Sequence, residues 1–341
     1  NNREERLSEG ERSRGAVFTA WNGECLQEHA IGSLLPDDLA AAADLLAREI
    51  TPRPRYPAPG PGSPLEAHFA LPVQIDPATR PARDKLEICQ RHHAAVRDLD
   101  RRLVNAQVTY EERFEAKVFA NRTRLISQTL VRIRFRIMLF ASDGQTVRHD
   151  WIFRDATGGL EIAHVSDDDL ADLAAGTVAL LGAQRIEPGF YDVICDPSVA
   201  GTVAHEAFGH GVETDMFLKQ RARAADYLGK RVGSPLVNLI DDPTFPGGYG
   251  SYRVDDEGQL ATPTTVLRAG IFEQGLTDLY SATRLGISRT ANGRRESFTH
   301  KAYARMSNTF FAPGETPLEE LIGGLDRGVL LRRMSSGMED P

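Results

Sequence analysis

The sequence predicts an α+β fold, in which an N-terminal domain of helices and antiparallel sheet precedes a mainly antiparallel β C-terminal domain that carries the active-site helix. Three patterns support this fold class. Helical stripes of apolar residues run through 35–50 and 84–103, and apolar residues alternate with arginines at 131–137. After residue 235, short apolar runs are separated by glycine-rich turns, which is typical of antiparallel β structure.

The first elements in the chain are two helices separated by a proline-rich stretch. Pro36 suits the start of the helix at 35–50. Residues 51–64 contain six prolines, which exclude helix and central strand, so we expect a linker there. In the second helix, at 84–103, Cys89, Val96 and similar apolar residues form the candidate core stripe.

Strands follow between residues 106 and 153. Where Val131, Ile133 and Phe135 alternate with Arg132, Arg134 and Arg136, one face of the sheet is core and the other is basic. The arginine row could guide an acidic substrate, but a solvated sheet face is the simpler interpretation, and we favour it. A third helix is expected after Ser166, which can cap it.

The chemically interesting helix begins after a short apolar strand at 190–195. Asp196 is placed as its N-cap and Pro197 as its first residue. Further strands are expected at 235–240, 264–272 and 307–311.

The composition is that of a globular, mildly acidic protein. With 341 residues, of which 41% are hydrophobic, the chain can bury the cores of two domains. Its net charge of -8 repels phosphate backbones, so we expect no nucleic-acid partner. No apolar run approaches the roughly 18 residues of a membrane helix, and three scattered cysteines make no disulfide framework. We therefore expect a cytoplasmic protein with reduced thiols and no membrane partner.

The motif His205-Glu206-Ala207-Phe208-Gly209-His210 carries the residue types that zinc chemistry needs. Neutral imidazoles are good Zn²⁺ ligands. A neighbouring glutamate that does not bind the metal can take a proton from water, whose pKa zinc lowers to about 7. The motif therefore predicts His205 and His210 as metal ligands and Glu206 as the catalytic base.

The five-residue spacing of the histidines constrains the backbone. In a regular α-helix five residues turn through about 500°, which leaves the two imidazoles roughly 140° apart. A π-bulge absorbs the extra residue and returns both side chains to one face. Gly209 lies within this interval and lacks a Cβ, which makes the distortion cheaper. The spacing predicts a π-type turn or a break near Gly209.

Chance could also bring two surface histidines and a glutamate together, but the capped helix start before the motif argues against it. Glu213 and Asp215 follow within about a turn of His210. Each could be a ligand or could orient an imidazole from the second shell of the metal, and each could equally be a simple exposed carboxylate.

The stretch from Ala204 to Glu213 resembles the signature of the TldD/PmbA family, also called modulators of DNA gyrase. Three downstream blocks agree in order: Asp255-Asp256-Glu257-Gly258, Ala291-Asn292-Gly293-Arg294-Arg295 and Arg305-Met306-Ser307-Asn308-Thr309. The resemblance covers about Lys85 to Leu331 and leaves residues 1–80 unmatched. With it we divide the chain into the unmatched segment 1–80, which contains the linker 51–64, an N-terminal α/β domain at 81–187, and a C-terminal metallopeptidase domain at 188–341.

This resemblance implies a cytoplasmic Zn²⁺ metallopeptidase that hydrolyses unfolded or flexible peptides within a dimer. The catalytic, TldD-like subunit of the family carries the His-Glu pattern and can pair with a homologous subunit that lacks it. By that pattern this chain is the catalytic type, with His205 and His210 as ligands and Glu206 as general base. A homodimer and a heterodimer are both compatible with the resemblance.

The third zinc ligand of the family is a cysteine near the C-terminus, and no cysteine follows Cys195 here. Cys195 lies ten residues upstream of the motif and does not match that position. We expect the C-terminal domain to be truncated and the cysteine to lie beyond Pro341. Arg305 and Asn308 are candidates for substrate binding, although packing and turn formation explain them equally well.

Two other functions compete with the peptidase. The alternative from another class is a non-catalytic regulatory or binding subunit of a TldD/PmbA-type complex, which modulates gyrase or a toxin–antitoxin pair. A third possibility keeps the zinc site but hydrolyses a small amide or ester, since an activated water attacks any polarised carbonyl.

Overall fold

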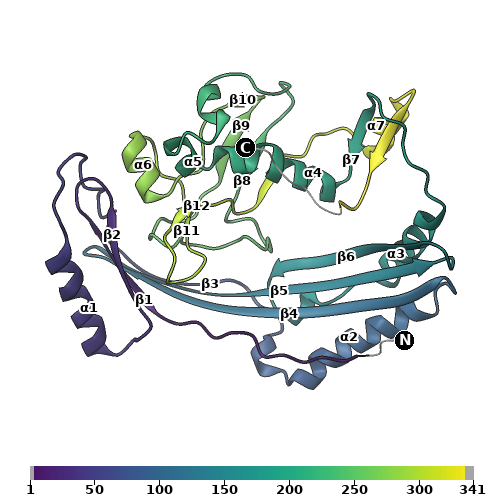
Figure 1. The fold of residues 1–341 in the computed structure, drawn as a ribbon, viewed down its shortest axis with the longest axis horizontal. Coiled ribbons are helices and arrows are strands. Elements are labelled where there is room, and N and C mark those ends of the chain that lie inside the picture. The colour runs from purple at the N-terminus through teal and green to yellow at the C-terminus, as the bar shows by residue number, and fades with distance from the viewer. Residues whose placement is uncertain (1–3, 335–341) are drawn as a thin grey trace.

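A long antiparallel sheet forms the base of the molecule in the computed structural model, which describes residues 4–334 (Figure 1). Strand β5 (Arg124–Ser142) pairs along its length with β4 (Leu103–Ala120) and, in its second half, with β6 (Val147–Thr157). Strand β3 (Leu65–Ala70) pairs in parallel with the first half of β5. The alternating pattern expected for this region is confirmed.

Two helices cover one face of this sheet. Helices α2 (Ala82–Arg97) and α3 (Asp167–Ala179) pack with Phe135, Ile137 and neighbouring apolar residues of β5 in one core. Ser166 caps α3 by accepting the amide of Asp169, as expected from the sequence. Helix α2 ends at Arg97, before the expected end at residue 103, because the chain turns there and enters β4.

The first part of the chain forms a small unit at one end of the sheet (Figure 1). Strands β1 (Ala16–Trp21) and β2 (Leu26–Ile31) make a hairpin, and α1 (Pro36–Glu49) follows. Residues 51–64 form neither helix nor strand, as their prolines require. The domain division at residue 80 remains a prediction, although β3 joins the sheet formed by the next segment.

The second face of the sheet carries the C-terminal part of the chain, which lies above the sheet in Figure 1. Arg132 is only 6% exposed and donates to the carbonyl oxygens of Tyr249 and Ser251. The guanidinium of Arg134 lies 4.6 Å from the ring centroid of Tyr249. The expectation of a solvated arginine face is therefore wrong for Arg132. Arg132 does alternate with the apolar residues of β5, as expected, but residues 249–251 cover its face of the strand.

The C-terminal part combines short strands and short helices, so the mixed α+β class is confirmed. Its main sheet has the antiparallel order β10-β9-β8-β13. A parallel pair of strands, which the sequence did not indicate, joins β7 to β14. The strands are β7 (Asp192–Cys195), β8 (Leu239–Asp241), β9 (Thr264–Arg268), β10 (Ile271–Phe272), β11 (Gly293–Arg294), β12 (Tyr303–Ala304), β13 (Thr309–Phe311) and β14 (Gly328–Leu331). The α-helices are α4 (Pro197–Val203), α5 (Thr214–Leu218), α6 (Leu279–Leu285) and α7 (Leu318–Gly323).

None of the helices within residues 4–334 combines the length and the apolar character that a bilayer crossing needs.

Candidate metal centre

The helix that carries the motif begins where the sequence places it. Pro197 is the first residue of α4, and the side chain of Asp196 accepts the amide of Val199 at 2.9 Å. The second carboxylate oxygen of Asp196 accepts the amide of Arg333 at 3.1 Å. The helix start is therefore held both by its own cap and by the segment that follows β14.

A π-helix at Ala204–Gly209 continues α4 and contains most of the motif. The amide of His210 donates to the carbonyl oxygen of His205, which is the i to i+5 bond of a π turn. The two imidazole rings lie 4.5 Å apart between centroids and are inclined by 80°. The predicted π turn and the convergence of the histidines are confirmed.

Gly209 allows this turn for a different reason from the one expected. Its φ of -59° and ψ of -53° are ordinary helical angles, so the backbone conformation does not require glycine. A Cβ at this position would lie 2.2 Å from Sδ of Met306. A side chain at residue 209 would therefore require Met306 to shift away from the turn.

Glu213 is buried and close to His210, so it is not the exposed carboxylate that the sequence left open. It is 2% exposed and accepts the Nη1 of Arg305 at 2.9 Å and the amide of Met306 at 3.3 Å. Its Oε2 lies 3.6 Å from Nδ1 of His210. Burial raises the pKa of Glu213, against the opposing effect of Arg305.

Asp215 is also buried, with 5% of its surface exposed, which corrects the possibility of a simple surface carboxylate. Its Oδ2 forms an ion pair with Lys219 at 2.7 Å. Its Oδ1 is buried and has no hydrogen-bond partner within residues 4–334. The polar contacts of Asp215 thus lead toward Lys219 rather than toward either histidine.

The two substrate-binding candidates lie in different surroundings. Arg305 holds Glu213, and its side chain is 49% exposed. The amide group of Asn308 donates to the carbonyl of Asp242 and to Oγ of Ser251, and its Oδ1 accepts the amide of Gly250. Because the chain uses the whole side-chain amide of Asn308, we do not propose a substrate-binding role for it.

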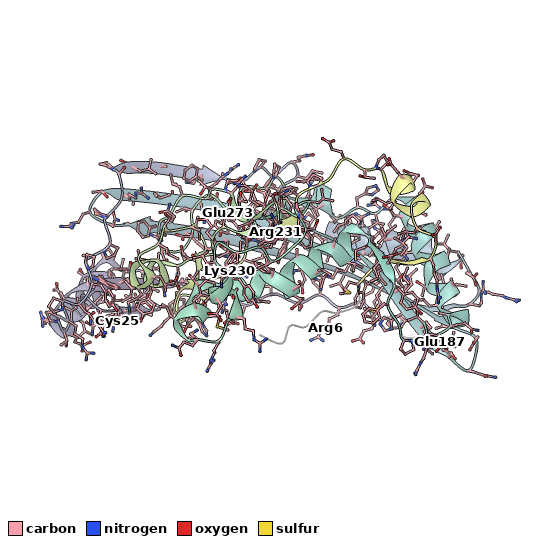
Figure 2. The ribbon with its side chains drawn as sticks, turned by 90° about the horizontal axis from the view of Figure 1, so that it is seen from above. Arg6, Cys25, Glu187, Lys230, Arg231 and Glu273 are labelled. Carbon is pink, nitrogen blue, oxygen red and sulfur yellow. The ribbon has the colours of Figure 1, made fainter. Side chains whose placement is uncertain are left out.

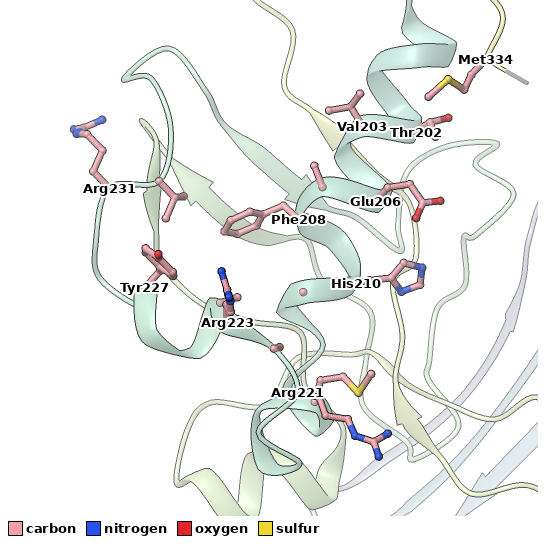
Figure 3. Close-up of a pocket in the computed structure, with 16 residues that line it drawn as sticks. Thr202, Val203, Glu206, Phe208, His210, Arg221, Arg223, Tyr227, Arg231 and Met334 are labelled. Atoms are coloured by element: carbon pink, nitrogen blue, oxygen red, sulfur yellow. The ribbon is translucent and has the colours of Figure 1, made fainter. Parts of the chain in front are cut away.

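A cavity of about 790 Å³ opens beside the motif (Figure 3). Glu206 and His210 line it and point to the same side of the helix, and Phe208 lines it on the opposite side of the helix. None of the side chains of His205, Glu206 and His210 makes a hydrogen bond within the described part of the chain. They remain available to a ligand.

The environment of His205 favours the neutral ring. Desolvation and then the neighbouring His210 lower the pKa of His205, although the residue is exposed to solvent. A neutral imidazole is the form that binds zinc. Two converging imidazoles of this kind fit a zinc ion.

The same centre lacks a third ligand among the described residues. No group of three His, Cys, Asp or Glu side chains within residues 4–334 could hold a metal ion. Cys195 is therefore not brought to the histidine pair. The cysteine that we expect beyond Pro341 lies outside the described residues.

The remaining sequence blocks form a buried polar network rather than a second site. Asp255 accepts the amides of Glu257, Gln259 and Gly293. Asp241 accepts Nδ2 of Asn292 and the amide of Ser307, and so joins the network to β13. These blocks connect the loops that surround the motif helix.

Residues 216–232 supply the opposite wall of the cavity, which sequence patterns do not predict. This segment has short helical turns and no clear periodicity, so pattern gave no reason to place it there. A usable signal was present in its charge, because residues 219–231 hold five cations in an acidic chain.

Comparisons with known proteins show similarity to metallopeptidases. Residues 188–341 match the model of the PmbA/TldA metallopeptidase C-terminal domain. A metalloprotease of Methanothermobacter thermautotrophicus is 32% identical over 82% of this chain and 62% of its own length. A protein named zinc metalloprotease TldD homolog, from Saccharolobus solfataricus, is 29% identical over 65% of this chain and 50% of its own length. The chain thus spans less than two thirds of these curated relatives.

A solved structure also has this fold. The crystal structure of a putative modulator of a DNA gyrase from Thermotoga maritima matches with a TM-score of 0.75 and 22% identity. The match covers 92% of this chain and 70% of that one. It therefore includes most of residues 1–80, which the sequence resemblance left unmatched. The chain belongs to the PmbA/TldD family of metallopeptidases.

Proposed function

We propose that this protein is a zinc-dependent peptidase of the catalytic, TldD-like type, which hydrolyses unfolded or flexible peptides. The observation that carries the proposal is the π turn, because it brings the rings of His205 and His210 to 4.5 Å while Glu206 faces the cavity. The metalloprotease names of the relatives support the same activity.

His205 and His210 would hold the zinc ion, together with a third ligand that residues 4–334 do not supply. When bound, zinc supplies a Lewis acid that polarises a carbonyl group and lowers the pKa of water. The Glu206 carboxylate takes a proton from the attacking water and delivers it to the nitrogen of the leaving amine. Glu206 is suited to this because no internal hydrogen bond within residues 4–334 occupies its oxygens.

Glu213 acts as a second-shell residue and positions His210. Its buried carboxylate lies 3.6 Å from Nδ1 of His210 and is itself fixed by Arg305 and Met306. A carboxylate on this side favours a proton on Nδ1 and so would keep the ring in a form that can hold zinc. Arg305 therefore works through Glu213, and we do not assign it to the substrate.

The cavity beside the motif is large enough for several residues of an extended peptide, and part of its lining is apolar. We propose that the working form is a homodimer or a heterodimer with a homologous subunit, as the family resemblance implies. Peptides rather than small amides are favoured because a cavity of about 790 Å³ is larger than a small amide needs.

The Glu206→Gln variant tests the catalytic role. Since general base catalysis contributes about 100- to 10,000-fold, kcat/KM for an unstructured peptide should fall by at least about 100-fold. Zinc content, measured by atomic absorption, should equal that of the wild type. Turnover at the wild-type rate in Glu206→Gln would contradict the proposal, and a zinc-free, inactive wild type with a co-purifying partner would favour the regulatory alternative.

A further inference from the structure

The wall of the cavity opposite the motif helix is unusually cationic for this protein. Residues 219–231 contain a single carboxylate, Asp226, in a chain whose net charge is -8. Their five cations are Lys219, Arg221, Arg223, Lys230 and Arg231. Figure 2 labels Lys230 and Arg231 in the same region of the molecule, together with Glu273. Arg221, Arg223 and Arg231 line the cavity.

Some of these cations are occupied by the chain itself. Lys219 pairs with Asp215 at 2.7 Å. Nη1 of Arg231 donates to the carbonyl oxygen of Ala269 at 2.8 Å, and Arg231 points away from the cavity centre in Figure 3. These two side chains contribute to structure.

Arg221 and Arg223 differ from these cations. Both are exposed, and neither forms a side-chain hydrogen bond or an ion pair with any residue from 4 to 334. In Figure 3, Arg221 lies below His210 and Arg223 lies between the motif helix and Tyr227. Among residues 4–334, Glu206 is the only carboxylate that lines the same cavity.

We propose that Arg221 and Arg223 select peptides that carry Asp or Glu side chains close to the bond to be cleaved; this rests on the proposed peptidase function. A guanidinium binds a carboxylate through two parallel hydrogen bonds, and charges of one sign in a cleft concentrate substrates of the opposite sign. Phe208, Tyr227 and Val232 supply apolar contacts for the remaining parts of the peptide.

A matched pair of peptides tests this selection. Both are acetylated, amidated and fluorescently labelled, and they differ only in carrying two Glu or two Gln residues. Binding is measured by fluorescence anisotropy on the full-length Glu206→Gln protein, which should not cleave them, and kcat/KM is measured on the wild type. An exposed ion pair is worth up to about 1 kcal/mol, so we expect the Glu peptide to bind about fivefold to tenfold more tightly at low salt. The preference should shrink as salt increases.

Two variants assign the preference to the cavity. In the double variant Arg221→Gln/Arg223→Gln, the ratio of the dissociation constants of the two peptides should fall most of the way to one. Arg122→Gln removes the same kind of charge from an exposed turn between β4 and β5, far along the chain from the cavity, and should keep the ratio. Circular dichroism establishes that each variant is folded.

Equal binding of the two peptides by the Glu206→Gln protein would overturn this inference. An unchanged ratio of the two dissociation constants after Arg221→Gln/Arg223→Gln is added to that protein would overturn it as well. A free C-terminal carboxylate is a second source of the same chemistry, and a third peptide with two Gln and an unblocked C-terminus measures it. Tighter binding of that peptide than of the Glu peptide would also contradict the proposal. The binding measurement is independent of turnover, so a failure of the peptidase proposal is seen separately in the Glu206→Gln kinetics.

Discussion

The motif turn and the polar network behind it use charged side chains in opposite ways. In the network, Asp241 and Asp255 are at most 3% exposed, and each accepts several hydrogen bonds from the chain. In the turn, Glu206 and the two histidines make no side-chain hydrogen bond within residues 4–334.

This difference separates structural from functional polar groups. A buried carboxylate is expensive unless the chain satisfies it, so the bonds of Asp255 are expected for a residue that holds loops together. Polar side chains that face a cavity without internal partners are free to bind a ligand. Met306 packs against the turn itself and fills the space beside Gly209.

The turn should be tested first by filling the space between Gly209 and Met306, which should lower the free energy of unfolding. Gly209→Ala places a Cβ 2.2 Å from Sδ of Met306, and such overpacking costs about 1–3 kcal/mol. The free energy of unfolding, measured in urea, should fall by this amount.

The control is a double-mutant cycle with Met306→Ala, which removes the obstructing side chain. In that background Gly209→Ala should cost little or even stabilise, because alanine favours helix over glycine. An equal cost in both backgrounds would mean that packing of Met306 does not hold the turn.

A second effect should appear in the pH dependence of the network. Burial raises the pKa of Glu257 to about 8, with further contributions from Asp255 and Asp278 and an opposing one from Arg289. The ordinary pKa of such a group is 4.5, so between about pH 4.5 and 8 the folded protein keeps a proton that the unfolded chain has lost. The stabilisation is complete below pH 4.5 and is lost as the pH rises through 8.

Glu257→Gln has no proton to lose, so its free energy of unfolding should fall less steeply over this range. The difference in slope should be at most about 1.4 kcal/mol per pH unit. Glu66→Gln, at an exposed position of β3, serves as the control and should keep the wild-type slope. If Glu257→Gln and wild type show the same slope, Glu257 is ionised in the folded protein.

Features that depend on neighbouring residues could be predicted from the sequence. The cap at Asp196, the cap at Ser166 and the π turn follow from the types and the spacing of nearby residues. The candidate ligands His205 and His210 were found in the same way, since their convergence requires only the local backbone.

Features that depend on distant contacts could not be predicted. Met306 lies almost a hundred positions after Gly209, so no local pattern shows that it packs there. Arg132 has the alternation of a solvated strand face, yet the loop at 249–251 covers it. The parallel pairing of β7 with β14 likewise joins segments that are far apart in the chain.

The central claim is that the π turn makes His205 and His210 a metal-binding pair. Zinc titration by calorimetry tests this claim most directly. We expect one zinc ion per chain in the wild type. Loss of a group that orients a metal ligand typically weakens metal binding by roughly 10- to 100-fold, and we expect Glu213→Gln to fall within that range. His210→Ala removes a ligand itself and should weaken zinc binding by more. His300→Ala, at an exposed histidine outside the motif, should bind zinc as the wild type does. Equal zinc affinity in His210→Ala and in the wild type would contradict the account.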